Sequence, residues 1–219
     1  MDYLNELFSD EALAVMELQR DLLFHRIPKE NIRQYVEIPI AVGRENAEKL
    51  HNRPISELCE EKQIKIRLSD GAQGMAGMTF RASITYSGNG AELTLFKNAI
   101  DDLMINANVY LLPEDRFTSQ SARDMLIAHE LFHFLEFSDI GDTANRTEKV
   151  EIQKLFGRRR FANIMRCGEV GAHAFAKELL GLPFFPNLTD YLYLVATGKW
   201  SEQKLVERLN YAHGLLELK

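Results

Sequence analysis

The chain has 219 residues, of which 46% are hydrophobic, and a formal net charge of -6. This composition predicts a folded globule with one substantial core, and the acidic balance argues against nucleic acid or an anionic membrane as a direct partner. No apolar run approaches the roughly 20 residues that cross a bilayer, and the N-terminus lacks a basic segment followed by an apolar one. A cytoplasmic location is therefore expected.

Helical periodicity dominates the first sixty residues. Apolar residues recur at helical spacing over residues 1–26, and the pattern stops near Pro28. A second helix is expected around residues 43–51. Pro54 suits the first turn of a third, short helix over residues 54–63, because a first-turn proline loses no helical hydrogen bond.

The next segment has the composition of strands. IKIRL at residues 64–68 alternates apolar and charged side chains. Residues 74–96 are rich in Gly, Thr and β-branched or aromatic residues, with SGNG at 87–90 as a turn signal. These patterns predict a small antiparallel sheet.

The remaining elements are expected to be mainly helical. Residues 98–110 have a helical pattern, and Thr118 or Ser119 is placed to cap a helix over residues 120–137. Four further helices are predicted, over residues 148–156, 169–181, 189–197 and 202–217. The expected fold class is α+β, with a small, mostly antiparallel sheet packed against two of these helices and with helical N- and C-terminal segments.

No repeat, low-complexity tract or long linker divides the chain. We therefore predict a single domain over residues 1–219. It comprises a helical N-terminal part at 1–62, a core at 63–185 and C-terminal helices at 186–219.

The helix over residues 120–137 carries His129-Glu130-Leu131-Phe132-His133, an H-E-x-x-H pattern. Residues four apart lie on one helix face, so both imidazoles can reach a single ion, with Glu130 beside it. Two neutral imidazoles, one carboxylate and an open fourth position are typical of a catalytic zinc site, whereas structural sites are closed and usually rich in thiolates. The pattern predicts that His129 and His133 bind Zn²⁺.

Two glutamates are candidates for the third ligand. Glu136 shares the helix face of the histidines, but a continuous helix would place it about 10 Å along the axis from His129. Glu169 is expected on a separate helix, from which it can approach the ion from the side. We favour Glu169, and regard Glu136 as a helix-end carboxylate or a partner of a ligand histidine.

The residues after Glu169 follow the arrangement E-x-x-A-x-x-F-A-x-x-L-L. This arrangement resembles the glutamate-helix signature of the ImmA/IrrE family of metallopeptidases, which are gluzincin-like, and strands followed by a helix with HELFH are similar to the same family. The resemblance covers roughly residues 60–185. It implies a compact α+β peptidase in which His129, His133 and Glu169 bind zinc and Glu130 is the catalytic base.

Two features depart from that family pattern. Gluzincins commonly carry an acidic or amide residue four positions after the glutamate ligand, where this chain has His173. As a neighbour of Glu169, His173 could hydrogen-bond a ligand, donate to a developing oxyanion, or lie at the pocket rim. The gap from His133 to Glu169 is also long, so the segment between them resembles an insertion.

Other positions leave alternatives open. Tyr191, Tyr193 and His213 join His173 as candidate oxyanion donors, although a core or surface role suits each of them. AELTLFK at residues 91–97 is the candidate edge strand for a bound peptide, or an ordinary strand of the sheet. The run of Arg158, Arg159 and Arg160 could meet an acidic substrate, or form a solvated surface.

These observations predict a zinc-dependent metalloendopeptidase that cleaves a peptide or protein, by resemblance a regulatory protein. The alternative is a non-catalytic metal-binding regulator that works by binding a partner protein. The sequence does not predict an oligomeric state.

Overall fold

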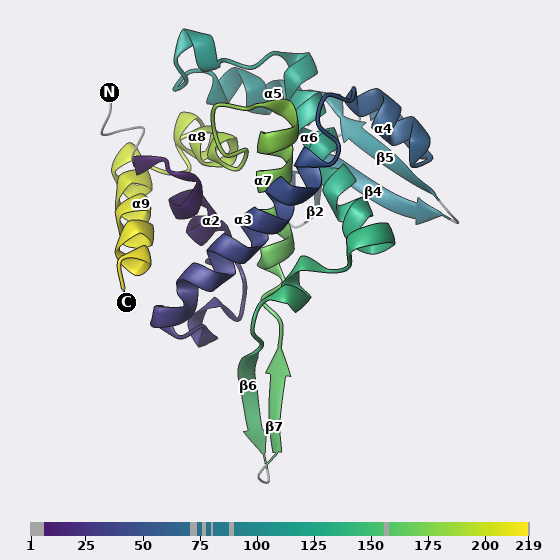
Figure 1. Ribbon diagram of the computed structural model, residues 1–219. Helices are drawn as coiled ribbons and strands as arrows, with labels where there is room; N and C mark the ends of the chain where they lie inside the picture. Colours follow the sequence, from purple (N-terminus) through teal and green to yellow (C-terminus); the bar gives the residue numbers. More distant parts are fainter. Residues whose placement is uncertain are drawn as a thin grey trace.

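The computed structural model describes residues 7–70, 74–75, 78–79, 81–87, 90–155 and 158–218. In this part of the chain, eight α-helices accompany a three-stranded sheet and two two-stranded hairpins, so the fold is α+β, as predicted. The helices gather around α7 (Arg166–Leu180), with the three-stranded sheet to one side (Figure 1). No helix of the described residues combines the length and the apolarity needed to cross a membrane.

The first described helix, α2 (Asp10–Leu18), is shorter than the helix predicted over residues 1–26. Residues 1–6 lie outside the described part of the chain, and the helix ends at Leu18. The reason is Asp21, whose Oδ1 atom accepts a hydrogen bond from the backbone N–H of Leu23 at 2.8 Å. Such a local side-chain bond competes with helix continuation. Two 3₁₀ turns follow, η1 (Phe24–Arg26) and η2 (Lys29–Asn31).

The second helix, α3 (Ile32–Glu48), begins eleven residues before the predicted start at 43 and contains Pro39. Proline has no N–H, so the carbonyl of Tyr35 loses its helical partner. The thiol Sγ of Cys167 lies 4.0 Å from that carbonyl oxygen. Tight packing supports the helix as well, because a Cβ added at Gly43 would lie only 2.3 Å from a backbone oxygen of α7. The short helix α4 (Ile55–Glu61) follows its proline as predicted.

The three-stranded sheet has the order β1-β5-β4 and comprises β1 (Ile64–Ser69), β5 (Gly90–Phe96) and β4 (Ala82–Ser87). The central strand β5 runs parallel to β1 and antiparallel to β4, so the sheet is mixed, where a mostly antiparallel sheet was predicted. The prediction of residues 91–97 as an edge strand is therefore wrong, because β1 adds to the side of β5 that faces away from its hairpin partner. Among the described strands, β4 is the outer strand on its side of the sheet.

Strands β2 (Gly74–Met75) and β3 (Met78–Thr79) form a separate antiparallel pair. The predicted turn at 87–90 has its two central residues outside the described part of the chain.

Helix α5 (Lys97–Ala107) matches its prediction, and a 3₁₀ turn, η3 (Pro113–Asp115), leads to α6 (Ser119–Leu135). The cap of α6 is Thr118, whose side chain accepts a hydrogen bond from the backbone N–H of Ser121, while the Ser121 side chain accepts one from the backbone N–H of Thr118. This reciprocal pair fixes the helix start. After Leu135 the helix widens into a π-helical turn, η4 (Glu136–Ile140).

The helix predicted over residues 148–156 is wrong, because the structure has an antiparallel hairpin there. After a 3₁₀ turn, η5 (Thr143–Arg146), strand β6 (Val150–Leu155) pairs with β7 (Arg158–Ala162). The β-branched residues Val150 and Ile152 stand two positions apart, which suits a strand, and a nine-residue helix has little stability of its own. This hairpin projects away from the body of the molecule (Figure 1).

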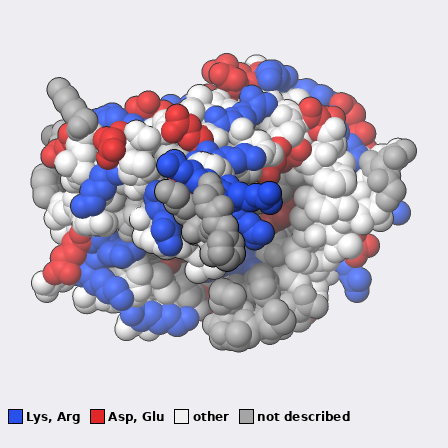
Figure 2. Space-filling model, turned by 90° about the horizontal axis from the view of Figure 1, so that it is seen from below, with Lys and Arg blue, Asp and Glu red and all other residues white. Residues whose placement is uncertain are grey.

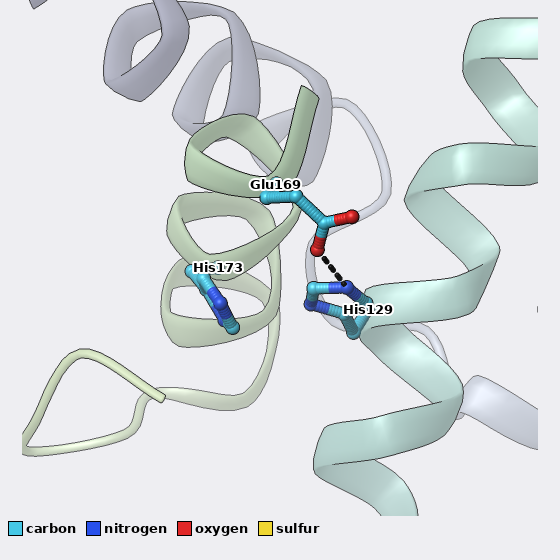
Figure 3. Close-up of side chains that lie close together, drawn as sticks. All are labelled: His129, Glu169 and His173. Atoms are coloured by element: carbon cyan, nitrogen blue, oxygen red, sulfur yellow. Dashed lines mark ion pairs between the residues drawn. The ribbon is translucent and has the colours of Figure 1, made fainter. Parts of the chain in front are cut away.

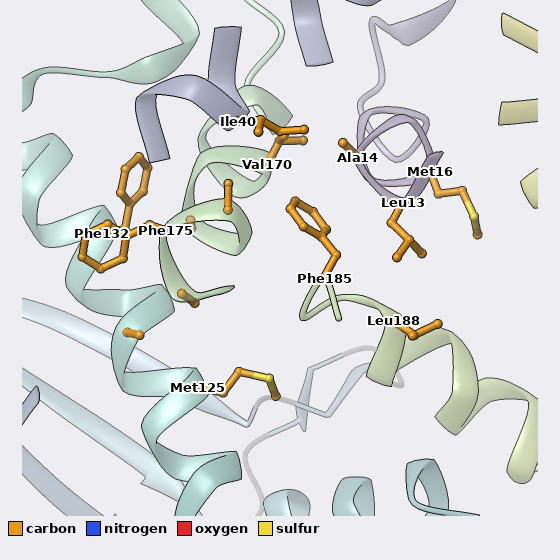
Figure 4. Packing of buried hydrophobic residues seen from close by; sticks show 14 of the residues in the cluster. Leu13, Ala14, Met16, Ile40, Met125, Phe132, Val170, Phe175, Phe185 and Leu188 are labelled. Carbon is orange, nitrogen blue, oxygen red and sulfur yellow. The ribbon is translucent and has the colours of Figure 1, made fainter. Parts of the chain in front are cut away.

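The C-terminal third follows the predicted helices closely. Helix α7 ends at Gly181, which has a left-handed conformation with φ of 62°. Helices α8 (Leu188–Ala196) and α9 (Glu202–Leu216) complete the chain. Side chains from α2, α3, α6 and α7 meet in one buried cluster, in which the rings of Phe132 and Phe175 have centroids 5.4 Å apart (Figure 4).

Candidate metal centre

The candidate site lies where α6 and α7 pack against each other. His129 and His133 face α7 from α6, and Glu169 faces α6 from the first turns of α7. The approach is close because Gly171 has no side chain: a Cβ there would lie 2.9 Å from the ring of Phe132. The glycine thus brings the glutamate helix within reach of both histidines.

Three donor atoms from these helices converge. The Nε2 atoms of His129 and His133 lie 3.2 Å apart. The Oε2 atom of Glu169 lies 3.2 Å from the first and 3.9 Å from the second. A tetrahedral zinc ion with bonds of about 2.0–2.1 Å would hold its ligand atoms about 3.3 Å apart. The spacing of the three donors therefore fits a single small ion.

His173 adds a further donor on α7. The ligand atoms of His129, Glu169 and His173 lie within 4.8 Å of one another, so these residues form a candidate metal-binding group (Figure 3). The ring centroids of His173 and His129 are 4.6 Å apart. The buried Nδ1 atom of His173 has no hydrogen-bond partner among the described residues. His133 and His173 thus compete for the place of third ligand, and the shorter spacing favours His133.

Glu136 lies behind His133, away from the converging donors. Its Oε2 atom accepts a hydrogen bond from Nδ1 of His133 at 2.9 Å, and its Oε1 atom accepts one from the backbone N–H of Thr143 at 2.8 Å. Gly168 makes room for this carboxylate, because a Cβ there would lie 3.3 Å from Oε2. Since an ionised carboxylate only accepts, Nδ1 carries the proton and Nε2 is left for a metal. Of the two candidate glutamates, only Glu169 lies beside both Nε2 atoms.

An arginine contacts Glu169 from the other side. The Nη1 atom of Arg166 lies 3.9 Å from Oε1 of Glu169 and 2.9 Å from Oε1 of Glu17. The side chain of Glu17 is 1% exposed and also pairs with Arg20 at 3.0 Å. These ion pairs link α2 to the start of α7, so they restrain the Glu169 carboxylate.

The electrostatics of the site couple the histidines to the carboxylates. Burial works to lower the pKa of His133, but hydrogen bonds to Glu136 and Glu169 outweigh it and raise this pKa to about 10. Burial works to raise the pKa of Glu169, whereas its bonds to His129 and His133 hold the pKa well below the ordinary value. Burial, with the nearby His129, lowers the pKa of His173, which leaves that ring neutral.

Glu130 lines an open pocket of about 410 Å³ beside the donors. Ile84 and Tyr86 of β4 form another wall of this pocket. The ring of Tyr86 lies against Phe137, with centroids 4.6 Å apart. Burial and the carboxylates of Glu130 and Glu136 raise the pKa of Tyr86, so its hydroxyl keeps its proton and can donate it in a hydrogen bond.

Three predicted oxyanion candidates lie elsewhere. Tyr193 donates its hydroxyl hydrogen to Oδ2 of Asp102 at 2.8 Å, and Nε2 of His213 lies 3.0 Å from the backbone oxygen of Leu7. Tyr191 is buried. Within the described residues, none of the three lines the pocket that contains Glu130.

Two residues of the site carried sequence signals that the prediction did not use. Arg166 precedes Glu169 by three positions, a spacing at which side chains on a helix meet. Tyr86 lies two positions after Ile84, so both side chains share a face of the strand. The helical spacing identifies Glu169 as a partner of Arg166, whereas the place of Tyr86 in the pocket depends on the contact between α6 and β4, which only the tertiary structure supplies.

No protein-family model, curated protein or solved structure matches this chain. The chemistry available to the site therefore follows from its own geometry. Two imidazoles, one carboxylate and a second carboxylate in an adjoining open pocket are suited to metal-assisted hydrolysis.

Proposed function

We propose that this chain is a zinc-dependent metallopeptidase similar to the ImmA/IrrE family, with His129, His133 and Glu169 as zinc ligands. The observation that carries the proposal is the convergence of two Nε2 atoms and one Oε2 atom, no two more than 3.9 Å apart. This donor set is that of catalytic zinc sites, whereas Mg²⁺ and Ca²⁺ prefer oxygen ligands.

The residues around the donors would perform the proton transfers. A bound zinc ion would lower the pKa of a water molecule and polarise the scissile carbonyl. Glu130 accepts a proton from the attacking water and passes it to the leaving amine, because its carboxylate is next in sequence to His129 and faces the open pocket. The protonated hydroxyl of Tyr86 is the proposed donor to the carbonyl oxygen.

The polypeptide substrate would add to the sheet along β4. This strand is paired on one side with β5 and contributes Ile84 and Tyr86 to the pocket. An extended peptide on its outer edge gains main-chain hydrogen bonds that do not depend on sequence. The catalytic role predicted for His173 stays a prediction, and its contact with the His129 ring supports a positioning role.

Zinc content and proteolysis of matched variants test this function. The variants are Glu130→Gln and, as a control, Glu45→Gln on the exposed face of α3. Zinc is measured by metal analysis after dialysis without chelator, and cleavage with a fluorogenic peptide library and an unfolded protein. We expect one zinc per chain in every protein and a loss of about 100- to 10,000-fold in cleavage rate for Glu130→Gln alone.

Two outcomes would contradict the proposal in different ways. If the native protein retains no zinc, the proposed zinc site is wrong. Native protein that retains zinc but cleaves no probe would favour the non-catalytic regulator that binds a partner protein.

A further inference from the structure

The β6–β7 hairpin lies on the connection between the two helices that carry the donors. Its base is anchored by Val150, which is 3% exposed. Its returning strand carries three exposed arginines, Arg158, Arg159 and Arg160, which we call the hairpin arginines. The hairpin is therefore fixed at its base and presents its charged strand to solvent.

The hairpin concentrates positive charge in an acidic chain. Residues 149–163 contain five basic residues and one acidic residue, whereas the whole chain has a net charge of -6. Arg159 lies 3.5 Å from Glu151, and both side chains are largely solvated. Within the described part of the chain, Arg158 and Arg160 have no ion pair. Figure 2, seen from the hairpin end, shows Lys and Arg side chains gathered there. An anionic partner would complement this charge.

An exposed aromatic residue accompanies the arginines. Phe161 is 52% exposed. It stands two positions from Arg159, so both side chains lie on one face of β7, whereas Arg158 and Arg160 lie on the other face. Among the described strands β7 pairs only with β6, so a segment laid along its outer edge can meet side chains from both faces. Arginine and aromatic residues are enriched at protein interfaces, where they supply most of the binding energy. The combination fits a polypeptide ligand with acidic and apolar side chains.

The hairpin begins and ends near the pocket that contains Glu130. Met165, which is 61% exposed, lines that pocket and follows the end of β7 by three residues. The chain can extend at most about 13 Å from Met165 to Phe161 and about 23 Å to Arg158. A substrate bound at the pocket could therefore reach the hairpin with about four to seven extended residues.

We propose that the hairpin arginines and Phe161 bind an acidic segment of the polypeptide substrate, outside the bond that is cleaved. This inference rests on the proposed peptidase function. The hairpin arginines are absent from the donor set and from the pocket lining among the described residues, so docking adds binding affinity without altering the chemical step. Its kinetic signature is therefore a change in KM with kcat unchanged.

Nucleic acid is the weaker partner for this surface. Affinity for a nucleic-acid duplex comes largely from Lys and Arg side chains that neutralise phosphates. The hairpin offers five basic residues, and the chain around it is acidic. Phe161 adds apolar surface that a phosphate backbone would not cover.

Direct binding tests the docking surface without requiring cleavage. A labelled sixteen-residue peptide rich in Asp and Glu, with two Phe residues, is titrated with the full chain by fluorescence anisotropy. The test variant is Arg158→Gln/Arg159→Gln/Arg160→Gln. The charge-matched control is Arg53→Gln/Arg67→Gln/Lys199→Gln, whose three exposed side chains lie outside the hairpin. We expect the control to bind as the native protein does and the test variant to bind at least tenfold more weakly.

Three outcomes would overturn the proposal. The native protein could fail to bind the peptide, or both variants could weaken binding of the peptide equally. A mixed-sequence DNA duplex could also bind more tightly than the peptide, in a manner that depends on the hairpin arginines. Circular dichroism establishes that each variant is folded. Because binding is read without turnover, a failed docking surface and a failed peptidase function give different results.

A second readout uses any peptide that the native protein cleaves. The peptide is extended by four Glu residues, placed five residues from the cleaved bond on either side. We expect one extension to lower KM at least fivefold for the native protein and for the control, with kcat unchanged, and to have no effect on the test variant. An equal KM for the extended and unextended peptides would count against docking.

Discussion

The α6–α7 contact and the β6–β7 hairpin are joined in sequence but are built on opposite principles. The helix contact is closed by glycines, buried ion pairs and a capped helix start, and the three donor atoms lie 3.2–3.9 Å apart, close to the spacing of about 3.3 Å around a tetrahedral zinc ion. The hairpin is anchored at its base and otherwise solvated. The metal donors, whose function depends on precise distances, lie on the two packed helices. The proposed recognition of an acidic segment, which depends on charge, lies on the projecting strand β7.

The largest expected effect on the α6–α7 contact is the difference in zinc binding between variants of Glu169 and Glu136, the two glutamates beside His133. Glu169→Ala should abolish zinc retention after dialysis, because it removes a donor beside both Nε2 atoms. Glu136→Ala should weaken zinc binding by only about 10- to 100-fold, the usual effect of losing a residue that orients a ligand. Competition with a chromophoric chelator measures both. Loss of zinc from Glu136→Ala alone would reverse the assignment.

Helix packing gives the next largest effect. Gly43→Ala places a methyl group 2.3 Å from the backbone oxygen of Gly171 and should destabilise the fold by about 1–3 kcal/mol. Gly214→Ala on α9 is the matched control, since nothing lies within 4 Å of its added Cβ. It should stabilise by about 0.5–1 kcal/mol. Urea unfolding measures both, and an unchanged midpoint for Gly43→Ala would show that α3 and α7 are not in close contact.

The pH dependence of zinc binding probes the same carboxylate–histidine pair. The pKa of His133 in metal-free protein is about 10, and zinc requires the neutral imidazole, so zinc affinity should rise up to tenfold per pH unit from pH 6.5 to 8.5. Chelator competition at three pH values measures this slope. Glu136→Gln removes the negative charge of the carboxylate whose hydrogen bond to His133 raises this pKa, and should flatten the slope. A slope unchanged by that variant would argue against the bond.

The stability of metal-free protein should change with pH in the opposite direction to the zinc affinity. The folded-state pKa of His133 lies above its unfolded value, so its contribution is fully present below about pH 6.5 and is lost as the pH rises through about 10. The folded-state pKa of Glu169 lies below its unfolded value, so its contribution is present above about pH 4.5 and is lost in acid. Thermal melts of metal-free protein should therefore show a lower Tm at pH 9 than at pH 6. A Tm that rises between these values would contradict the raised pKa.

The hairpin should give the smallest stability effect. Replacing the hairpin arginines by Gln should change the free energy of unfolding by less than about 0.5 kcal/mol per residue, because they are solvated. Val150→Ala at the base should cost about 1–2 kcal/mol through lost burial. A large loss from the arginine variant would mean that the hairpin has a structural role.

Local sequence signals determined much of this molecule. Thr118, one of the two predicted caps, begins α6, and helical spacing placed His129 and His133 on one face. Helix α7 ends at Leu180, one residue before the predicted end. Each depends on neighbours within a few residues, which is why the sequence could specify it. The preference for Glu169 over Glu136 also came from helix geometry, since an axial rise of 1.5 Å per residue limits the reach of a single helix.

Long-range contacts decided the rest. Helix α3 continues through Pro39 because its packing on α7 compensates for the lost hydrogen bond, and the central position of β5 depends on which side β1 joins. The hairpin replaced a predicted helix because strand pairing across a turn stabilises residues whose own helical preference is weak. The sequence by itself determined which residues could hold a metal; only the tertiary structure, through the glycine-mediated approach of α7 to α6, brought Glu169 to the histidines and left Glu136 behind them.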